Sequence, residues 1–415
     1  MSLVNAIGFM LRGGSAAAKF LFVLYLAGKT SSELLGQVAI LIAVAAIFTQ
    51  IAGLEVNQVV GRQLHALSGD ERIQLFRRHA LAAITAYFVL TPVALAFYSD
   101  LLIPNWTGVV CILVLEHLIT EVYRYNILML RPTYASALFF IKNAGWILVF
   151  VLLAETGIAA PSFALVVQCW AGILVLTGTP LIVSRHVWPT LRTFVRPSAW
   201  LPQTASLVWQ ARLFVVSSIA LAGVGSIDKL LIGERFSTAE LGVYFFFSTC
   251  TSVISLLVSF SIGATAGPRC IKIFATEGRV AYLPQYRRLQ KLYWLTTFAA
   301  VLAITLPAGS LLAFFDKLVY LQHLEILYLL TPAAALVVLC EPYKMTAYLE
   351  RRDLELVLGN VFHLISVVAC VTLFSQQDDF VWVAVGMLLS SMLTYAFFAL
   401  NVGGWVVSRW RLTPA

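Results

Sequence analysis

Residues 35–54 read LGQVAILIAVAAIFTQIAGL, a run without one charged side chain. A helix rises about 1.5 Å per residue, so a run of roughly 20 residues crosses the ~30 Å hydrocarbon core of a bilayer. Eleven further apolar runs cover most of the chain, and each is a solid block rather than the alternating pattern of a membrane barrel. We therefore expect an all-α polytopic membrane protein. The predicted spans are 5–27, 35–54, 80–98, 102–121, 134–154, 162–182, 213–232, 241–263, 292–315, 325–346, 354–374 and 380–404.

The composition leaves little room for a soluble part, because 60% of the residues are hydrophobic and 12% are charged. No GxxxxGK[ST] motif occurs, so no ATP hydrolysis is predicted. The six cysteines are isolated and the six histidines show no paired ligand spacing, so neither a disulfide framework nor a metal site is predicted. The sequence predicts no cofactor and no enzymatic activity.

The basic residues predict the orientation of the chain in the membrane. Of the 28 Lys and Arg residues, four lie deep within spans, and three, Lys29, Arg235 and Lys317, fall in loops on one side. The remaining 21 fall on the other side, and loops rich in Lys and Arg stay in the cytoplasm. Both termini are therefore expected in the cytoplasm of a cell whose inner (plasma) membrane holds the protein. Basic loops beside anionic lipids also explain the net charge of +8 without nucleic acid.

The chain contains an internal repeat. GKTSSELLGQVAILIA begins at Gly28, after the first span, and GERFSTAELGVYFFFS begins at Gly233, after the seventh. An even number of spans per half keeps both halves in the same orientation, so a parallel repeat is predicted. We expect an N-terminal six-helix bundle over 1–182, a cytoplasmic linker over 183–212 and a C-terminal six-helix bundle over 213–415, arranged around a central cavity.

Four stretches carry a family resemblance: ELLGQV at 33–38, GLEVNQVVGRQL at 53–64, EHLITEVYRYNILMLRPTYASALFFIKNAGW at 116–146 and IDKLLIGERFSTAELGVY at 227–244. They resemble the polysaccharide-export, or Wzx-like O-antigen flippase, branch of the multidrug/oligosaccharidyl-lipid/polysaccharide (MOP) superfamily. The resemblance covers spans one to eight and fades afterwards. The resemblance implies two six-helix bundles around a cavity. It also implies that the substrate is a polyprenyl-diphosphate-linked oligosaccharide, which the protein moves from the cytoplasmic to the outer leaflet. Surface polysaccharide biosynthesis (O-antigen, capsule or exopolysaccharide) would be the setting, with a polysaccharide polymerase and chain-length machinery as partners.

Charged side chains inside a membrane cost roughly 2.5–3.5 kcal/mol each on insertion scales, so they are expected to face protein or water and to have a function. Arg12 and Lys19 are two helical turns apart and share one face of the first span with Ser15. If the substrate is a diphosphate lipid, this cationic face is a candidate contact for the phosphates. The alternative is that both cations form buried structural ion pairs with Glu55 or Glu116.

A second set of charges occupies the fourth and fifth spans. Glu116, Thr120 and Arg124 lie four residues apart in turn and form one polar face. Arg124 and Lys142, which lies near the midpoint of the fifth span, are further candidate diphosphate contacts. Glu116 is a candidate for the residue that couples transport to an ion gradient, because the protonation of a carboxylate inside a membrane changes with its solvation. The coupling ion would then be H+, and Na+ is the other candidate. The alternative is that Glu116 only neutralises Arg12, Lys19 or Lys142.

Asp228 and Lys229 belong to the stretch that carries the resemblance, near the outer end of the seventh span. Adjacent residues on a helix point to different faces, so the two side chains are not expected to pair with each other. We expect a gating or structural role for them. Pro332 and Pro342 predict a kink or break in the tenth span, since proline removes a helical hydrogen bond.

Three other functions compete with the flippase. A drug or metabolite cation antiporter of the same superfamily would have a more acidic membrane interior than this chain, whose deep charges are mainly basic. A membrane glycosyltransferase or polysaccharide polymerase would carry a large external loop, and every predicted external loop here is short. A scaffold without transport would not need four deep cations.

Overall fold

The computed structural model of the protein describes residues 3–54, 69–128, 132–182, 197–258, 262, 264–314 and 317–403. Over these ranges the chain is helical and contains no strand, which confirms the predicted all-α class. Nine of the described helical stretches are long and apolar enough to cross a membrane. The protein is therefore a multi-pass membrane protein.

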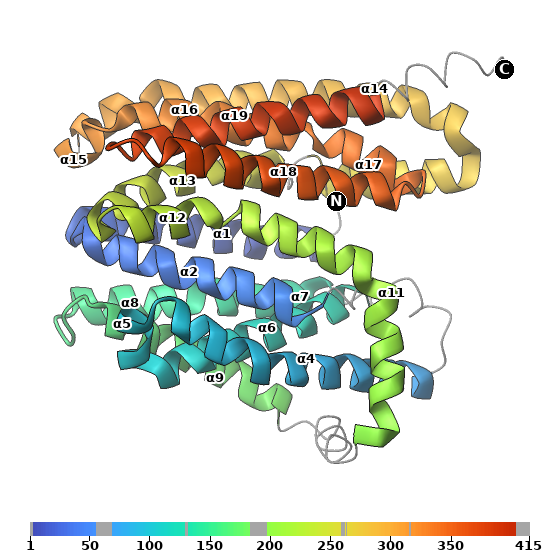
Figure 1. Ribbon diagram of the computed structural model, residues 1–415, viewed down its shortest axis with the longest axis horizontal. Helices are drawn as coiled ribbons and strands as arrows, with labels where there is room; N and C mark the ends of the chain where they lie inside the picture. The colour runs from blue at the N-terminus through green and yellow to red at the C-terminus, as the bar shows by residue number, and fades with distance from the viewer. Residues whose placement is uncertain are drawn as a thin grey trace. The chain divides into compact units, whose positions relative to one another are not determined.

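Figure 1 shows the principal helices, and each predicted span overlaps at least one of them. They are α1 (Leu3–Lys29), α2 (Ser32–Ala52), α4 (Gly69–Phe97), α5 (Ser99–Leu102), α6 (Trp106–Leu128), α7 (Pro132–Phe140), the π-helix η3 (Ile141–Gly145), α8 (Trp146–Glu155), α9 (Phe163–Ile182), α11 (Pro197–Val224), α12 (Ile227–Arg235), α13 (Thr238–Val258), α14 (Ala264–Phe314), α15 (Leu318–Leu321), α16 (Leu324–Leu339), α17 (Glu341–Leu349), α18 (Asp353–Phe374), α19 (Val381–Phe398) and the π-helix η5 (Ala399–Gly403).

Two predicted spans are interrupted. The seventh is split between α11 and α12, where the amide of Ser226 donates to the carbonyl of Gly223 and closes a turn. The tenth is split between α16 and α17, and Pro342, the second residue of α17, has no amide hydrogen to continue α16. The break predicted from the prolines is thus present at Pro342, whereas Pro332 lies inside α16.

The ninth predicted span is part of a longer segment, α14, which bends at Gly278. Gly278 has φ of 81° and ψ of −171°, a conformation that side chains other than glycine rarely adopt. The guanidinium of the next residue, Arg279, pairs with the carboxylate of Glu350 at the end of α17. This ion pair ties the bend of α14 to the α17 end.

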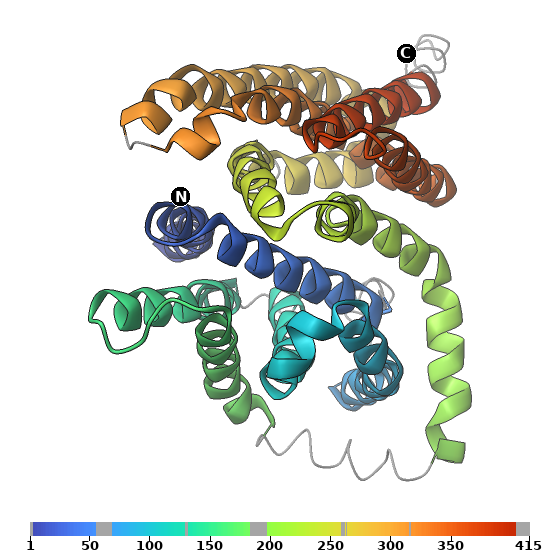
Figure 2. The same cartoon turned by 60° about the vertical axis from the view of Figure 1, so that its left-hand side comes forward.

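The chain folds into two compact units. The first consists of Met1–Phe22 and Gln37–Ala222, and the second of Val23–Gly36 and Gly223–Ala415. In the first unit α6 packs against α9, α7 and α4 (Figure 2). In the second unit α19 packs against α18 and α16, and α16 also contacts α13 and α14.

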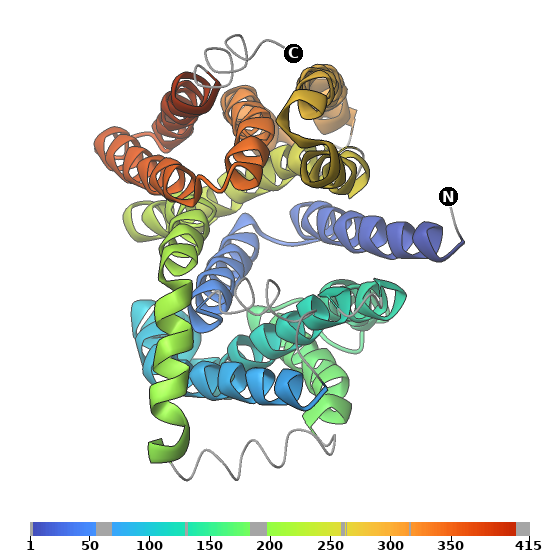
Figure 3. The same cartoon turned by 90° about the vertical axis from the view of Figure 1, so that its right-hand side faces the viewer.

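Residues 197–212, predicted as part of a linker, form the first half of α11 (Figure 3). Proline is tolerated at the first turn of a helix, where its missing amide hydrogen would have no helical partner, and Pro197 begins α11. The rest of the predicted linker, 183–196, lies outside the described residues.

The repeat brings the first turns of α2 and α13 into direct contact inside the second unit. A Cβ built on Gly36 would overlap the carbonyl oxygen of Thr238, and a Cβ built on Gly242 would overlap that of Ser32. The two contacts are reciprocal, because Gly36 and Ser32 occupy the same places in the first half as Gly242 and Thr238 do in the second. The backbones of α2 and α13 therefore touch at this crossing, and both positions require glycine.

Serine side chains start both helices. The amide of Leu34 donates to the Ser31 hydroxyl at 3.3 Å before α2. Before α13, the Glu240 amide donates to the Ser237 hydroxyl at 3.2 Å, and the Ser237 amide donates to the Glu240 carboxylate at 2.8 Å. The second arrangement is a capping box, which satisfies amide groups that have no partner within the helix.

Candidate functional site

A buried ion pair lies in the middle of the first unit. The ammonium group of Lys142, on η3, pairs with Oε1 of Glu116, on α6. The same ammonium donates to the Thr120 hydroxyl at 3.1 Å. The side chains of Lys142 and Glu116 are 7% and 14% exposed, so both charges are largely removed from solvent. The structure thus brings Lys142, predicted on the fifth span, together with Glu116 and Thr120, predicted on the fourth.

The backbone at Lys142 is unusual. Ile141–Gly145 forms one π-helical turn between α7 and α8. Such turns insert an extra residue into a helix and are frequent at functional sites. Lys142, Asn143 and Ala144 within the turn are buried, and Asn143 donates its side-chain amide to the carbonyl of Phe139 at 2.8 Å. This hydrogen bond ties the side chain of Asn143 back to α7.

Lys19, on α1, lies near this pair. Its charge interacts electrostatically with both Lys142 and Glu116. Unlike Lys142 it is exposed, and among the described side chains no carboxylate lies within 4.0 Å of its ammonium group. Glu116 therefore pairs with Lys142 rather than with Lys19. Glu55, the other predicted partner, lies outside the described residues.

An aromatic cluster packs the part of α1 that follows Lys19 against α8 and α9. Phe22, one turn further along α1, is 2% exposed and meets Trp146 edge to face, with ring centres 4.9 Å apart. Phe22 also meets Phe150 edge to face at 5.4 Å, and Trp146 stacks on Trp170 at 5.0 Å. Trp146 directly follows η3, so the cluster fixes α1 against the turn that carries Lys142.

Arg12 and Arg124 stand apart from this arrangement. Arg12 lies on α1, but its side chain is outside the described part of the structure. Arg124, on α6, donates to Glu121 at 2.9 Å, one turn back on the same helix. Ser15, on the predicted polar face of α1, is buried and donates its hydroxyl to the carbonyl of Leu11 at 3.0 Å.

The prediction that Asp228 and Lys229 do not pair with each other is wrong. The Lys229 ammonium lies 3.2 and 3.3 Å from the two carboxylate oxygens of Asp228 and 2.9 Å from the carbonyl of Gly225. Both residues begin the short helix α12, where the long lysine side chain folds back toward the break after α11. Asp228, which is 2% exposed, also accepts a hydrogen bond from the Tyr244 hydroxyl at 2.8 Å.

Asp228 is the second and Tyr244 the last residue of the 227–244 stretch, one of the four that carry the resemblance. Their hydrogen bond joins α12 to α13 within the second unit. These residues lie in a different unit from the Lys142 pair.

Comparison with known proteins supports the fold. No family model and no curated protein matches the sequence. Among solved structures, the lipid II flippase MurJ in an inward closed conformation matches with a TM-score of 0.65 and 14% identity, over 97% of this chain and 87% of that chain. A MATE transporter in complex with MaD3S matches with a TM-score of 0.56 and 15% identity, over 99% and 96%.

An outward-facing multidrug resistance MATE family transporter of the MOP superfamily matches with a TM-score of 0.51 and 12% identity, over 99% of this chain and 96% of that chain. Likeness at these identities concerns the fold. The protein therefore shares its multi-helix membrane fold with these solved structures, which include a lipid II flippase and a MATE family transporter of the MOP superfamily.

Proposed function

We propose that the protein is a flippase that moves a polyprenyl-diphosphate-linked oligosaccharide from the cytoplasmic to the outer leaflet, for surface polysaccharide biosynthesis. The observation that carries the proposal is the exposed Lys19 beside the buried Lys142–Glu116 pair. Two lysines in one membrane bundle form an attractive site for a diphosphate. A fold also used by a lipid II flippase is consistent with a lipid-linked substrate.

The charges in this site suggest how binding proceeds. Without substrate, Lys19, Lys142 and Glu116 together carry one positive charge. A diphosphate that links a lipid to a sugar keeps two ionised oxygens, so the loaded site would carry one negative charge. Net charge in a low-dielectric site is unfavourable, so uptake of a proton by Glu116 would restore neutrality. Diphosphate oxygens would then replace Glu116 as the partners of Lys142.

This scheme assigns different tasks to the two lysines. Lys19 is exposed and makes the first contact, and Lys142 is released to the substrate only when Glu116 is neutralised. Thr120 stays within hydrogen-bond distance of the Lys142 ammonium and limits its movement. Arg12 and Arg124 remain candidate contacts for the same headgroup. A coupled proton gradient would provide the driving force, with no resident cofactor.

The experiment that tests the function is export in cells that depend on this chain. Surface glycan and lipid-linked intermediate are measured together with the amount of protein in the membrane. We expect loss of the protein to stop surface glycan and to accumulate lipid-linked oligosaccharide on the cytoplasmic side. Normal surface glycan, combined with lost resistance to cationic drugs, would instead favour the cation antiporter. That alternative lacks support from the site, because its deep carboxylate, Glu116, is already paired with Lys142.

We also propose that both termini are cytoplasmic and that the membrane is the bacterial inner membrane. Two of the three cations predicted outside have structural roles: Lys317 donates to the carbonyl of Gly28 at 2.9 Å, and Arg235 donates to that of Ser375 at 3.0 Å. Cations at the carboxyl ends of helices are stabilising, which accounts for their place on that side. Single cysteines at 237 and 280 test the orientation with an impermeant thiol reagent in intact cells. Labelling at 237 alone is expected, and labelling at 280 alone would reverse the orientation.

The sequence-based division into bundles over 1–182 and 213–415 is retained as a proposal for the repeat. Contact with a polysaccharide polymerase and chain-length machinery likewise stays a prediction, which co-purification from membranes tests.

A further inference from the structure

A second polar cluster lies in the first unit, apart from the Lys142 pair. Its centre is Glu121 on α6, and each carboxylate oxygen faces one histidine. Oε2 lies 3.6 Å from Nε2 of His79, on α4, and Oε1 lies 3.7 Å from Nε2 of His117, on α6. The two histidines are 6% and 1% exposed. Neither Nε2 atom has a hydrogen-bond partner within the described part of the chain.

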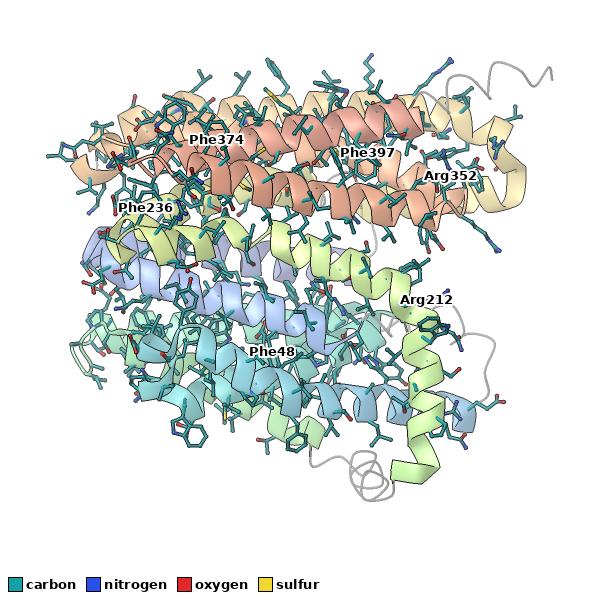
Figure 4. The ribbon with its side chains drawn as sticks, viewed as in Figure 1. Phe48, Arg212, Phe236, Arg352, Phe374 and Phe397 are labelled. Carbon is teal, nitrogen blue, oxygen red and sulfur yellow. The ribbon has the colours of Figure 1, made fainter. Side chains whose placement is uncertain are left out.

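The other groups around the cluster set its charge. Arg124 donates to Oε1 of Glu121 at 2.9 Å and balances the carboxylate. The Tyr87 hydroxyl lies 2.6 Å from Nδ1 of His117. When this nitrogen accepts the hydroxyl hydrogen, the ring of His117 is neutral and carries its own hydrogen on Nε2, the nitrogen that lies 3.7 Å from Glu121. The Tyr87 ring in turn stacks on Phe48 of α2, with ring centres 6.0 Å apart. Phe48 is labelled in Figure 4.

Two imidazoles on either side of one carboxylate form a place for an additional proton. His117 is buried and lies near His79, Arg124 and Lys142, so a positive charge on its own ring is unfavourable. His79 faces the free oxygen of Glu121, so the proton is better held between His79 and Oε2. His79 lies next to Arg78, where the apolar stretch of α4 begins, and Glu121 lies five residues before the apolar stretch of α6 ends at Asn126. The cluster is therefore near one end of both helices, the cytoplasmic end in the proposed orientation.

We propose that His79, Glu121 and His117 form a proton-binding site that exchanges one proton with the cytoplasm. One proton enters and joins His79 Nε2, and no bond other than the N–H bond is formed or broken. The site is distinct from Glu116, which lies more than one helical turn deeper along α6. Its role in driving transport rests on the proposed function, whereas proton binding itself does not.

Nuclear magnetic resonance of the full-length protein in detergent, labelled with 15N at histidine, tests proton binding without any substrate. His79→Gln and His117→Gln assign the two signals. In the wild type we expect both signals to change in one shared transition as the pH falls. Glu121→Gln should move that transition to lower pH by one unit or more, because the imidazolium loses its carboxylate. Glu121→Asp, which keeps the charge on a shorter side chain, should give a smaller displacement and covers the case in which the glutamine variant does not fold.

His323 and Glu325 form the matched control. They lie 3.7 Å apart, but they belong to the second unit and are 32% and 50% exposed. Glu121→Gln should leave the His323 signal unchanged, and Glu325→Gln should affect His323 alone. The proposal would be overturned if the His79 and His117 signals changed in separate transitions and neither Glu121 variant altered the pH of those transitions.

A transport measurement separates this site from the proposed function. In liposomes with a pH gradient, His79→Gln should lose the acceleration that the gradient gives to the wild type. If the wild type moves no lipid-linked oligosaccharide while the shared titration is present, the proposed function fails and the proton site stands. If the wild type responds to the gradient and His79→Gln responds equally, the coupling role is overturned.

Discussion

Lys19 and Lys142 should respond differently to removal, because only Lys142 neutralises a buried charge. Lys142→Ala leaves Glu116, whose side chain is 14% exposed, without its cation. Breaking a buried pair in this way costs about 3–5 kcal/mol. Lys19 is exposed and has no carboxylate within 4.0 Å among the described side chains, so Lys19→Ala should change the free energy of unfolding by about 0.5 kcal/mol or less. The difference of about 3 kcal/mol corresponds to more than a hundredfold in the ratio of folded to unfolded protein.

A double variant separates stability from function. Lys142→Met with Glu116→Gln removes both charges together, and replacement of a buried pair by neutral side chains is often neutral or stabilising. We expect this variant to unfold close to the wild type and still to be defective in transport. Lys19→Ala should likewise be stable and defective.

The assay is unfolding of each purified variant in detergent by titration with sodium dodecyl sulfate, beside glycan export in cells at matched protein levels. Equal destabilisation by Lys19→Ala and Lys142→Ala would contradict the assignment of Lys19 as an exposed residue. Full export by the stable double variant would show that Lys142 does not hold the substrate.

Two further predictions concern contacts within the second unit, and the first of them has a control in the first unit. Gly36→Ala should destabilise the protein by about 1–3 kcal/mol, because the new Cβ would overlap the Thr238 carbonyl and the two helices would have to separate. At the control position Gly172 a Cβ meets nothing within 4 Å, so Gly172→Ala should stabilise the protein by about 0.5–1 kcal/mol. The same unfolding titration measures both variants, and equal effects would contradict the close crossing. Tyr244→Phe removes a hydrogen bond to the buried Asp228 carboxylate and should cost about 1.5–3 kcal/mol; an unchanged unfolding midpoint would show that this bond does not hold α12 to α13.

Much of the fold is predictable from the sequence because hydrophobic length alone defines a membrane helix. The helix breaks are harder to predict. Residues 213–232 read as one apolar run, yet the chain turns at Ser226, where hydrophobicity gives no signal. Pro342 is the opposite case, since its missing amide hydrogen marks the break between α16 and α17 in the sequence itself.

The candidate site was only partly predictable, because its members come from different helices. The sequence identified Lys142 and Glu116 as deep charges, but it offered Lys142 as only one of three partners for Glu116. The cluster of His79 and His117 around Glu121 was missed altogether. The two histidines lie 38 positions apart in the sequence and meet only through the packing of α4 on α6, so no local spacing reveals them.

The repeat shows a further limit of sequence patterns. The repeated stretches place Gly36 and Gly242 at equivalent positions, but a sequence cannot show that equivalent positions touch. The pairing of Asp228 with Lys229 was excluded on helical geometry, and this reasoning failed because the lysine side chain is long enough to fold back along its own helix.

The most direct test of the central claim is the rate at which the purified protein moves lipid-linked oligosaccharide across a liposome membrane. Two substrates with the same short polyprenyl chain and the same oligosaccharide are compared, one joined by a diphosphate and one by an uncharged linkage. We predict that the wild type moves the diphosphate lipid at least tenfold faster than the uncharged one, and that Lys19→Ala removes this preference while remaining folded. Equal rates for the two lipids, or an unchanged preference in Lys19→Ala, would contradict a diphosphate site at Lys19 and Lys142.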